Sequence, residues 1–433
     1  MIYRKSMGLF GRKKQEAVEE TPPEPVGLPE APPLDDNGLR KVSDHTEYLL
    51  SLVEPLRPFG MGLLDAWDQV MCEDINSTIS VPPNSTAKTA GYAARAEDLF
   101  DAEGKQLGEL SLVRHCEQLQ PGTAAPVEAG QTLPLGTTTV LPVTFAEPQG
   151  DRLKLLGVTE PGEYIRAAGE HLALGSRLLS EGEVLDSRSI GMLASAGIDK
   201  VLVRPRPRVV VVSSGADLVE PGAEVGHGES TDANSFMIAA AAKAAGATVF
   251  RVAVHTSDTE VLKQAITDQL IRADLVISTT AGSREEYQAV MKAMGELGAF
   301  DSVNVAMSPG RMQSFGLIGD DRVPMVMLPG NPISAYVTFQ AFVWPLIRKL
   351  SGANSSRRLV RAITTGPIRS MKGQIHLLRG ALTLNGSINQ VERVHEAYGF
   401  AELKRTNCLI VLDEETDHVS AGGSVYCWLL DEE

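Results

Sequence analysis

Hydrophobic residues between Arg208 and Leu350 alternate between strand-like and helix-like spacing, which makes this stretch the easiest to interpret. Short apolar runs predict strands at Val209–Ser213, Thr248–Val254 and Leu275–Thr279. Amphipathic periods predict helices at Asn234–Ala245, Thr259–Arg272 and Arg284–Leu297. Strands and helices in this order indicate a parallel sheet with right-handed crossovers and helices on both faces.

The apolar run Met325–Leu328 predicts one more buried strand of this sheet. Pro329 and Gly330 end it, Asn331 is the expected helix N-cap and Pro332 the first helical residue. The helix should continue towards Gly352 with a kink at Pro345. Free N–H groups and the helix dipole make such a turn a candidate anion or phosphate site, and an ordinary strand-to-helix turn is the alternative.

Ligands of parallel sheets bind beyond the carboxyl ends of the strands. The residues that follow the predicted strands should therefore lie along one rim. They are Ser214–Asp217, Thr280–Glu286 and Gly330–Pro332.

The flanking regions have weaker patterns. Helical spacing begins at Ser43 or Asp44, with further helices predicted at Gly62–Met71, Arg166–Leu179 and Ser189–Ala196. The β-like runs Leu110–Val113 and Val140–Val143 indicate a β insertion. Strands are also predicted near the C-terminus, at Leu359–Thr364, Gln374–Leu384, Cys408–Leu412 and Val425–Leu430, with a hairpin turn at Asn385-Gly386.

These patterns predict an α/β multidomain chain. The expected units are a disordered, proline-rich tail (1–40), a helical linker (41–74 and 158–200), a β-rich insertion (75–157), an α/β sheet domain (201–353) and a C-terminal β domain (354–433).

Composition narrows the possible partners. A formal net charge of −15 argues against nucleic acid, and there is neither an 18-residue apolar run nor a signal peptide. The four cysteines have no metal-ligand spacing and suit a reduced cytoplasm. The basic segment Met7–Lys14 is either a membrane or receptor contact or a solvated tail.

Seven motifs, in order, resemble those of the molybdopterin molybdenumtransferase (MoeA) and gephyrin E-domain family. They are VPP…GYAARA (Val81–Ala96), GEHLALG (Gly169–Gly175), IGMLASAG (Ile190–Gly197), PRVVVVSSGADLVEPG (Pro207–Gly222), DAN (Asp232–Asn234), SPGRMQSFG (Ser308–Gly316) and LPGNPISA (Leu328–Ala335). The resemblance implies an elongated homodimer whose cleft inserts molybdate into adenylated molybdopterin with the help of Mg²⁺.

Several polar residues of the family's pattern are replaced here. The resemblance places family aspartates at Ser85, Ala90 and Thr138, a threonine at Ala129 and a lysine at Ser308. Two phosphate-loop glycines fall on Thr280-Ala281, and the last aspartate of that motif falls on Gln288. Because losing one electrostatic group commonly costs about 10²–10³ in rate, this pattern predicts that the chemistry has lapsed and that no cofactor is needed.

The first hypothesis is therefore a gephyrin-like scaffold, similar to the degenerate cell-division relatives of actinobacteria. It would bind a short disordered tail, such as the C-terminal tail of the tubulin-like division protein FtsZ, and be recruited from the cytoplasm to the division site or the inner face of the membrane. The resemblance implies a peptide groove lined by Tyr48, Phe339, Ile375, Tyr398, Phe400 and Asp413.

The alternative hypothesis is an active transferase that uses Mg²⁺, molybdopterin and molybdate. Its candidate carboxylates are Asp217, Asp232, Asp258, Glu285 and Glu286, with Asp217 and Asp232 as the candidate Mg²⁺ pair. A third possibility is that the chain binds a pterin or nucleotide without turnover. The predicted ligand-binding residues are Ser214, Gly215, Pro309, Gly310, Pro329, Gly330, Asn331 and Pro332.

Overall fold

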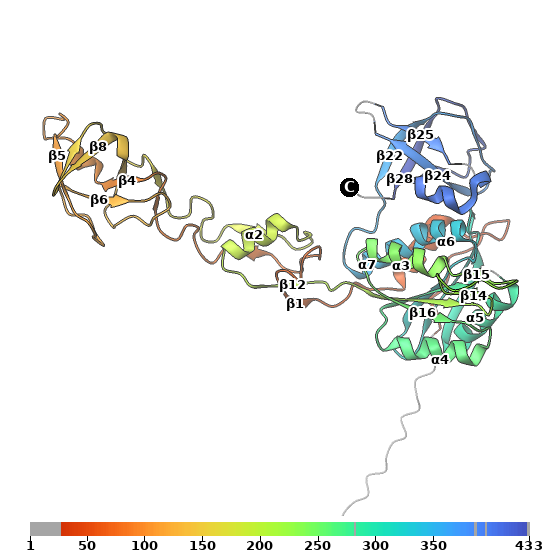
Figure 1. The fold of residues 1–433 in the computed structure, drawn as a ribbon. Coiled ribbons are helices and arrows are strands. Elements are labelled where there is room, and N and C mark those ends of the chain that lie inside the picture. The colour runs from red at the N-terminus through yellow and green to blue at the C-terminus, as the bar shows by residue number, and fades with distance from the viewer. Residues whose placement is uncertain (1–26, 281–282, 385–387, 395, 431–433) are drawn as a thin grey trace, which may run out of the picture.

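The structure is a computed structural model that describes residues 27–280, 283–384, 388–394 and 396–430. It is elongated (Figure 1). A β insertion at one end is joined through a slender segment (residues 59–80 and 166–203) to the sheet domain, and the C-terminal β domain is stacked on the sheet domain. No helix within the described ranges is long and apolar enough to span a membrane.

The sheet domain is built on a six-stranded sheet of order β16-β13-β17-β21-β20-β18. The first four strands are parallel: β16 (Thr248–Val254), β13 (Arg208–Ser214), β17 (Leu275–Thr280) and β21 (Val323–Met327). β20 (Met312–Ile318) and β18 (Gly298–Asn304) extend it antiparallel. The predicted parallel sheet is therefore confirmed in its first four strands. The antiparallel extension was not predicted, and it needs no crossover helix because a hairpin can lengthen a sheet edge.

Helices cover both faces of this sheet, as predicted. α3 (Asn234–Ala244), α6 (Pro332–Thr338) and α7 (Trp344–Leu350) cover one face; α4 (Thr259–Leu270) and α5 (Arg284–Leu297) cover the other. A π-helical segment, Phe339–Val343, joins α6 to α7 directly before Pro345. The prediction that this helix continues towards Gly352 is confirmed, and the wider π-helical turn directly before Pro345 accommodates the missing proline N–H.

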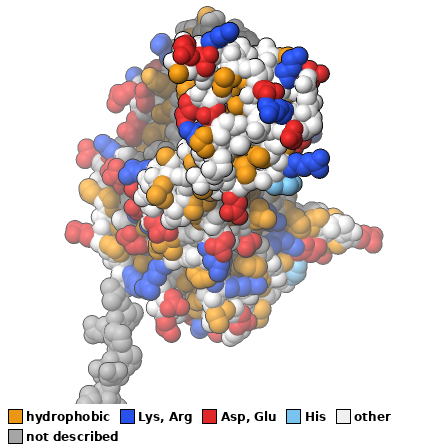
Figure 2. Space-filling view, turned by 90° about the vertical axis from the view of Figure 1, so that its left-hand side faces the viewer, with side chains coloured by type: hydrophobic (Ala, Val, Ile, Leu, Met, Phe, Trp, Pro, Cys, Tyr) orange, Lys and Arg blue, Asp and Glu red, His pale blue; other side chains and the backbone are white. Residues whose placement is uncertain are grey.

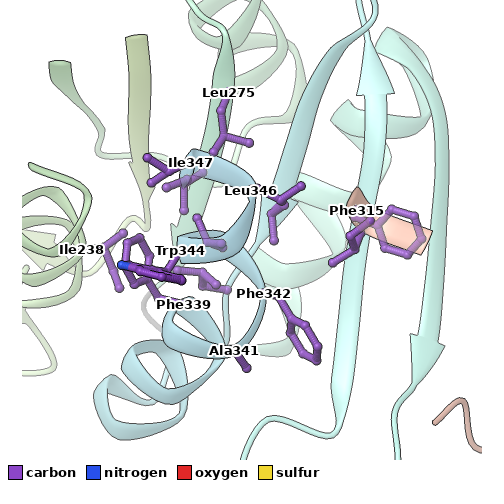
Figure 3. Close-up of a cluster of buried hydrophobic side chains, with 14 of the residues drawn as sticks. Ile238, Leu275, Phe315, Phe339, Ala341, Phe342, Trp344, Leu346 and Ile347 are labelled. Atoms are coloured by element: carbon purple, nitrogen blue, oxygen red, sulfur yellow. The ribbon is translucent and has the colours of Figure 1, made fainter. Parts of the chain in front are cut away.

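The main core lies between the sheet and this helical run. Phe339, Phe342, Trp344 and Ile238 belong to one buried cluster with Phe315 of β20 (Figure 3). Phe339 and Ile238 are 0% exposed. Burying an aromatic side chain of this size is worth about 1.5–3 kcal/mol, so this layer dominates the packing energy of the domain.

The N-terminal region differs from its prediction. Residues 1–26 of the predicted disordered tail lie outside the described ranges. Residues 27–40 are mostly exposed but contact the sheet domain through Leu28, which packs against its core, and end in the buried residues Leu39 and Arg40. Arg40 is 3% exposed and bridges to Val305, its N–H donating to Asn304 O at 2.9 Å. α1 (Val42–Ser51) begins after Lys41 rather than after Ser43, and it packs against α7 instead of joining a helical linker.

The slender segment is mostly not helical, so the helices predicted at Gly62–Met71 and Arg166–Leu179 are absent. The chain there forms turns and the short strands β1 (Phe59–Gly62), β2 (Ile75–Asn76), β10 (Ile165–Arg166), β11 (Arg177–Leu179) and β12 (Lys200–Val203). Gly169 and Gly175 adopt φ of +77° and +81°, which interrupts a helix. The helix predicted at Ser189–Ala196 is confirmed as α2 (Ser187–Ser195), capped by Asp186.

The β insertion is a six-stranded sheet of order β7-β4-β6-β5-β9-β8. Its strands are β4 (Gly91–Ala94), β5 (Glu109–Leu112), β6 (Thr123–Val127), β7 (Thr139–Pro142), β8 (Ala146–Gln149) and β9 (Arg152–Leu155). Both strands predicted here are confirmed as β5 and β7. Figure 2 views the molecule from this end and shows acidic and basic side chains interspersed.

The C-terminal β domain closes into a barrel, because β24 pairs with both β25 and β26. Its main strands are β22 (Leu359–Thr364), β24 (Ile375–Thr383), β25 (Gln390–Arg393), β26 (Cys408–Leu412) and β28 (Ser424–Leu429). β19 (Met307–Ser308) of the sheet domain pairs with β24 and ties the two domains together. The predicted Asn385-Gly386 turn lies outside the described residues.

Candidate functional site

A pocket of about 690 Å³ lies at the carboxyl ends of β17 and β21, beside the first turn of α5. We call it the strand-end pocket. Thr280, at the end of β17, and Pro329-Gly330, after β21, contribute to its wall. Because β13, β17 and β21 are parallel, their carboxyl ends meet at one edge, and the predicted rim is present there.

The start of α5 is held by a capping box that uses Glu286. Ser283 Oγ accepts from Glu286 N at 3.2 Å, and Ser283 N donates to Glu286 Oε2 at 3.4 Å. Glu286 is 3% exposed. Its carboxylate therefore satisfies helix N–H groups and is not directed into the pocket, which argues against the catalytic role predicted for it.

Two arginines, Arg284 and Arg311, line the strand-end pocket, and none of its described lining residues is an aspartate or glutamate. Neither guanidinium forms an ion pair or a side-chain hydrogen bond with a described residue. Elsewhere in the domain arginines are paired, as Arg208 is with Asp274 at 2.8 Å. Two unpaired positive charges make this pocket suitable for an anion.

The pocket lining also carries hydroxyl groups and apolar side chains. Tyr287 Oη lies 2.7 Å from Ser314 Oγ and 3.4 Å from Ser302 Oγ, and the two serine oxygens are 2.9 Å apart. Met312, Met327 and Leu328 supply the apolar wall. The arrangement suits a ligand with a flat or apolar body and a negatively charged end.

Gly310 forms the turn on one side of the pocket. It has φ +88°, and a Cβ there would collide with the hydroxyl of Thr338. Only glycine adopts this conformation at low cost, so the turn explains why the motif carries a glycine at this position.

Asp232 lies in a neighbouring pocket of about 190 Å³, which shares Thr280 and Gly330 with the first. Asp232 is 2% exposed and accepts hydrogen bonds from Ser235 N at 3.0 Å and from Ser235 Oγ. Arg251 Nη1 lies 3.5 Å from its carboxylate. The charge of Asp232 is thus already compensated within the protein.

The described residues do not fit a Mg²⁺ site. Asp217 is exposed in the turn after β13 and does not line the pocket of Asp232, its predicted partner. Asp258 caps α4 by accepting from Glu260 N at 2.8 Å, and Glu285 is exposed. No cluster of three histidine, cysteine or acidic side chains occurs among the described residues, whereas Mg²⁺ prefers carboxylate oxygens.

The predicted ligand-binding residues are divided between several places. Gly310, Pro329 and Gly330 line the strand-end pocket, and Pro332 lines the pocket of Asp232. Asn331 Oδ1 caps α6 by accepting from Ile333 N and Ser334 N, both at 3.1 Å. The remaining three residues lie in neither pocket; they are Ser214, Gly215 and Pro309.

The predicted peptide groove is only partly supported. Tyr48 is 5% and Phe339 0% exposed, so both are core residues and were wrongly assigned to a groove. Phe400 is exposed, Ile375 is half-buried, and the side chain of Tyr398 is outside the described part. Asp413 Oδ1 accepts from Thr416 Oγ1 at 2.6 Å, and this bond lowers the pKa of Asp413.

Sequence reasoning included Arg284 only as part of the rim range Thr280–Glu286, and it did not select Arg311 or Tyr287. Arg284 directly follows the α5 cap, and Arg311 lies within the quoted SPGRMQSFG motif. An arginine next to a predicted helix start at a strand end was the available signal, but only the strand order brings the two arginines to one pocket.

The β insertion has its own polar pocket of about 610 Å³, whose lining includes Ser85, Cys116 and Thr137. Ser85 Oγ accepts from Ala168 N at 3.3 Å, and Thr138 Oγ1 accepts from Ala96 N at 2.8 Å. Burial raises the pKa of the Cys116 thiol. Ser85 and Thr138 therefore present neutral groups where the resemblance places family aspartates, although Glu117 contributes a carboxylate to the lining of this pocket.

Comparison with known proteins gives matches along most of the chain. Residues 40–197 match the model "MoeA N-terminal region (domain I and II)", and residues 210–349 match "Probable molybdopterin binding domain". The chain is 31% identical over 414 residues to molybdopterin molybdenumtransferase 1 of Mycobacterium tuberculosis, covering 89% of this chain and 97% of the relative. It is 29% identical over 404 residues to transferase 2 of the same organism, covering 90% and 99%.

Among solved structures, the molybdopterin biosynthesis MoeA protein of Pyrococcus horikosii is similar in fold. The TM-score is 0.77 at 23% identity, covering 91% of this chain and 100% of that one. The predicted multidomain architecture is therefore confirmed, including the β insertion and the C-terminal β domain.

Proposed function

The chain belongs to the molybdopterin molybdenumtransferase family, and from this premise we propose that it handles a molybdopterin-type pterin in molybdenum cofactor biosynthesis. The strand-end pocket carries this proposal, because it combines unpaired arginines, hydroxyl groups and an apolar wall at the strand ends of the domain that matches a molybdopterin-binding model. In the family's reaction molybdate is inserted into adenylated molybdopterin.

The residues of this chain would bind and orient that substrate. Arg284 and Arg311 would hold its phosphate end, and the Tyr287–Ser314 hydroxyl pair would position a polar ring edge. Since the described residues do not fit Mg²⁺, no step in this proposal depends on the metal.

A complementation experiment tests this function. The chain is expressed in a bacterial strain that lacks its own molybdenumtransferase, and the activity of a molybdenum enzyme is measured with and without added molybdate. We expect rescue by the wild-type chain and loss of rescue by the Arg284→Ala/Arg311→Ala variant. Soluble wild-type protein that fails to rescue at every molybdate concentration would contradict the proposal.

As a second candidate we propose a gephyrin-like scaffold with lapsed transferase chemistry, recruited to the division site by the disordered tail of FtsZ. The observation that favours it is the engagement of Asp232, Asp258 and Glu286 in structural hydrogen bonds, which leaves no described carboxylate in the strand-end pocket. Titration with the tail peptide tests it. We expect Phe400→Ala to weaken binding, and absence of binding by the wild-type chain would exclude this partner.

We propose that either function uses an elongated homodimer. Support comes from apolar side chains that the slender segment leaves in water, with Leu64 84%, Phe59 61% and Trp67 51% exposed. Light scattering should give twice the chain mass of 46.4 kDa, and Leu64→Asp should shift the protein towards monomer. A wild-type monomer at micromolar concentration would contradict this state.

A further inference from the structure

We propose that the strand-end pocket holds the phosphate end of its ligand with Arg284 and Arg311, and that this binding needs no divalent cation. The inference rests on the proposed function, which places a phosphate-bearing pterin in this pocket. It adds that these two guanidinium groups neutralise the phosphate charge without a metal ion, and it departs from the Mg²⁺-assisted chemistry that the family resemblance implies.

The lining of the pocket is the first argument. In a phosphate-binding site Mg²⁺ is usually held by one or two carboxylates together with the phosphate and several waters, and the described lining includes no carboxylate. Glu286, in the first turn of α5, is occupied by the helix cap, and Asp232 is compensated by Ser235 and Arg251. Two guanidinium groups would also repel a metal ion, since like charges a few ångströms apart interact unfavourably even at a partly screened surface.

The state of the two arginines is the second argument. Arg284 and Arg311 are both exposed, and neither has an acidic partner within the described chain, although the protein carries a net charge of −15. Acidic partners are thus abundant but do not occur here. A phosphate or pyrophosphate group would relieve the repulsion between the arginines, and the planar guanidinium matches phosphate oxygens in bidentate geometry.

The remaining lining indicates the rest of the ligand. Met312, Met327 and Leu328 form an apolar wall, and Tyr287 adds an aromatic ring with a hydrogen-bonded hydroxyl. About 690 Å³ is within the usual size of pockets for small organic ligands. The site therefore fits a ring system that carries phosphate, a chemistry that a pterin phosphate shares with a nucleotide.

Calorimetric titration of the full-length chain tests the inference. Inorganic pyrophosphate, AMP and a pterin monophosphate are titrated separately, once in excess EDTA and once in millimolar MgCl₂. We expect the dissociation constant of the bound probe to be the same in both buffers. Because hydrogen bonds between charged groups are the strong ones, Arg284→Ala and Arg311→Ala should each weaken binding about 10- to 100-fold.

Arg358→Ala is the matched control, since Arg358 is also exposed but does not line the pocket, and it should leave binding unchanged. Tighter binding of the pterin phosphate than of AMP would identify a pterin site, and the reverse order a nucleotide site. Thermal unfolding of each variant verifies that the fold is retained.

Three results would overturn the inference in distinguishable ways. Binding that disappears in EDTA and returns with Mg²⁺ would overturn metal independence and leave the proposed function standing. Wild-type affinity in folded Arg284→Ala and Arg311→Ala proteins would show that the phosphate lies elsewhere. No binding of any probe in either buffer would overturn this inference and the proposed function together.

Discussion

The sheet domain and the slender segment bury their apolar residues to very different extents. In the sheet domain, Val209–Val212 and Leu275–Ile277 are 0% exposed, and helices cover both faces. The slender segment has a small cluster around Met71 and Leu193, while Leu64 on its surface is 84% exposed. Trp67, for which burial is the simplest expectation from sequence, is 51% exposed.

This difference explains where each region can tolerate change. A layered core fixes the sheet independently of the side chains at its rim, so residues around the strand-end pocket can be replaced without loss of the fold. The slender segment is too thin to enclose its own apolar surface and leaves side chains such as Leu64 and Phe59 exposed, which the proposed homodimer would cover. We therefore expect substitutions to have unequal effects on the stability of the two regions.

The largest expected effect is that of Phe339→Ala in the sheet-domain core. Phe339 is 0% exposed, and its removal should lower the free energy of unfolding by about 3–5 kcal/mol. Urea unfolding followed by tryptophan fluorescence measures this change. Phe400→Ala at the exposed surface is the control and should change stability by less than about 0.5 kcal/mol.

Leu193→Ala tests the smaller core of the slender segment. Leu193 is also 0% exposed, but the sparsely packed residues around it can collapse into the cavity that the substitution leaves. We therefore expect the free energy of unfolding to fall by about 2–3 kcal/mol, near the low end of the range for buried leucines. Hydrogen exchange should detect the loss in the slender segment with little change in β13 and β17. A cost equal to that of Phe339→Ala would mean that the two cores are equally rigid.

Acidification should weaken the sheet domain through His45. Burial, with a further contribution from the positive charge of Arg40, lowers the pKa of His45 to about 3. Protonation therefore favours the unfolded chain, in which the pKa is near 6.5, and stability falls as the pH drops from 6.5 towards 3. At pH 5 the loss should be about 2 kcal/mol.

Urea titrations between pH 7 and pH 5 measure this slope, and His45→Leu should flatten it. The only histidine in the described part of the slender segment, His171, is exposed, so His171→Leu should leave the slope unchanged. Equal slopes in wild type and His45→Leu would show that other groups cause the acid sensitivity.

The smallest expected effect is that of Ser283→Ala at the start of α5. It removes the hydroxyl that accepts from Glu286 N and should cost about 1 kcal/mol. Ser283→Asp, which retains a capping acceptor, should restore the stability measured by urea unfolding. An unchanged free energy of unfolding in Ser283→Ala would mean that water accepts the hydrogen bond from Glu286 N in place of the Ser283 hydroxyl.

The sequence predicted the sheet domain well because spacing and capping agree there. Arg284–Leu297 was predicted to the residue from its amphipathic period, and the structure adds a Ser283–Glu286 capping box at the same start. In the slender segment, the spacing of apolar residues alone led to wrong helix predictions. Apolar residues at helix spacing there form short strands and turns between glycines. The β18–β20 hairpin was not predicted, because its strands mix polar and apolar residues.

The candidate site was less accessible from sequence. Substitutions such as Ala90 and Ala129 show from sequence alone that side-chain oxygens are missing. Arg284 and Arg311 meet in one pocket because of the order of the strands in the sheet. Local sequence patterns do not reveal that order, which is a property of the complete fold. Tyr48 and Phe339 were misassigned because the resemblance carries over positions in the chain but does not reveal whether an aromatic side chain faces a core or an open groove.

The pairing of β1 with β12 places Phe59 directly opposite Val203. The polypeptide thus leaves the sheet domain and returns to it along two paired strands. The residues between these strands form the slender segment and the whole β insertion. A short hairpin joining the two strands could replace this excursion without disturbing the rest. Evolution could accordingly exchange or remodel the protruding arm as a module, while the remaining body keeps its own fold.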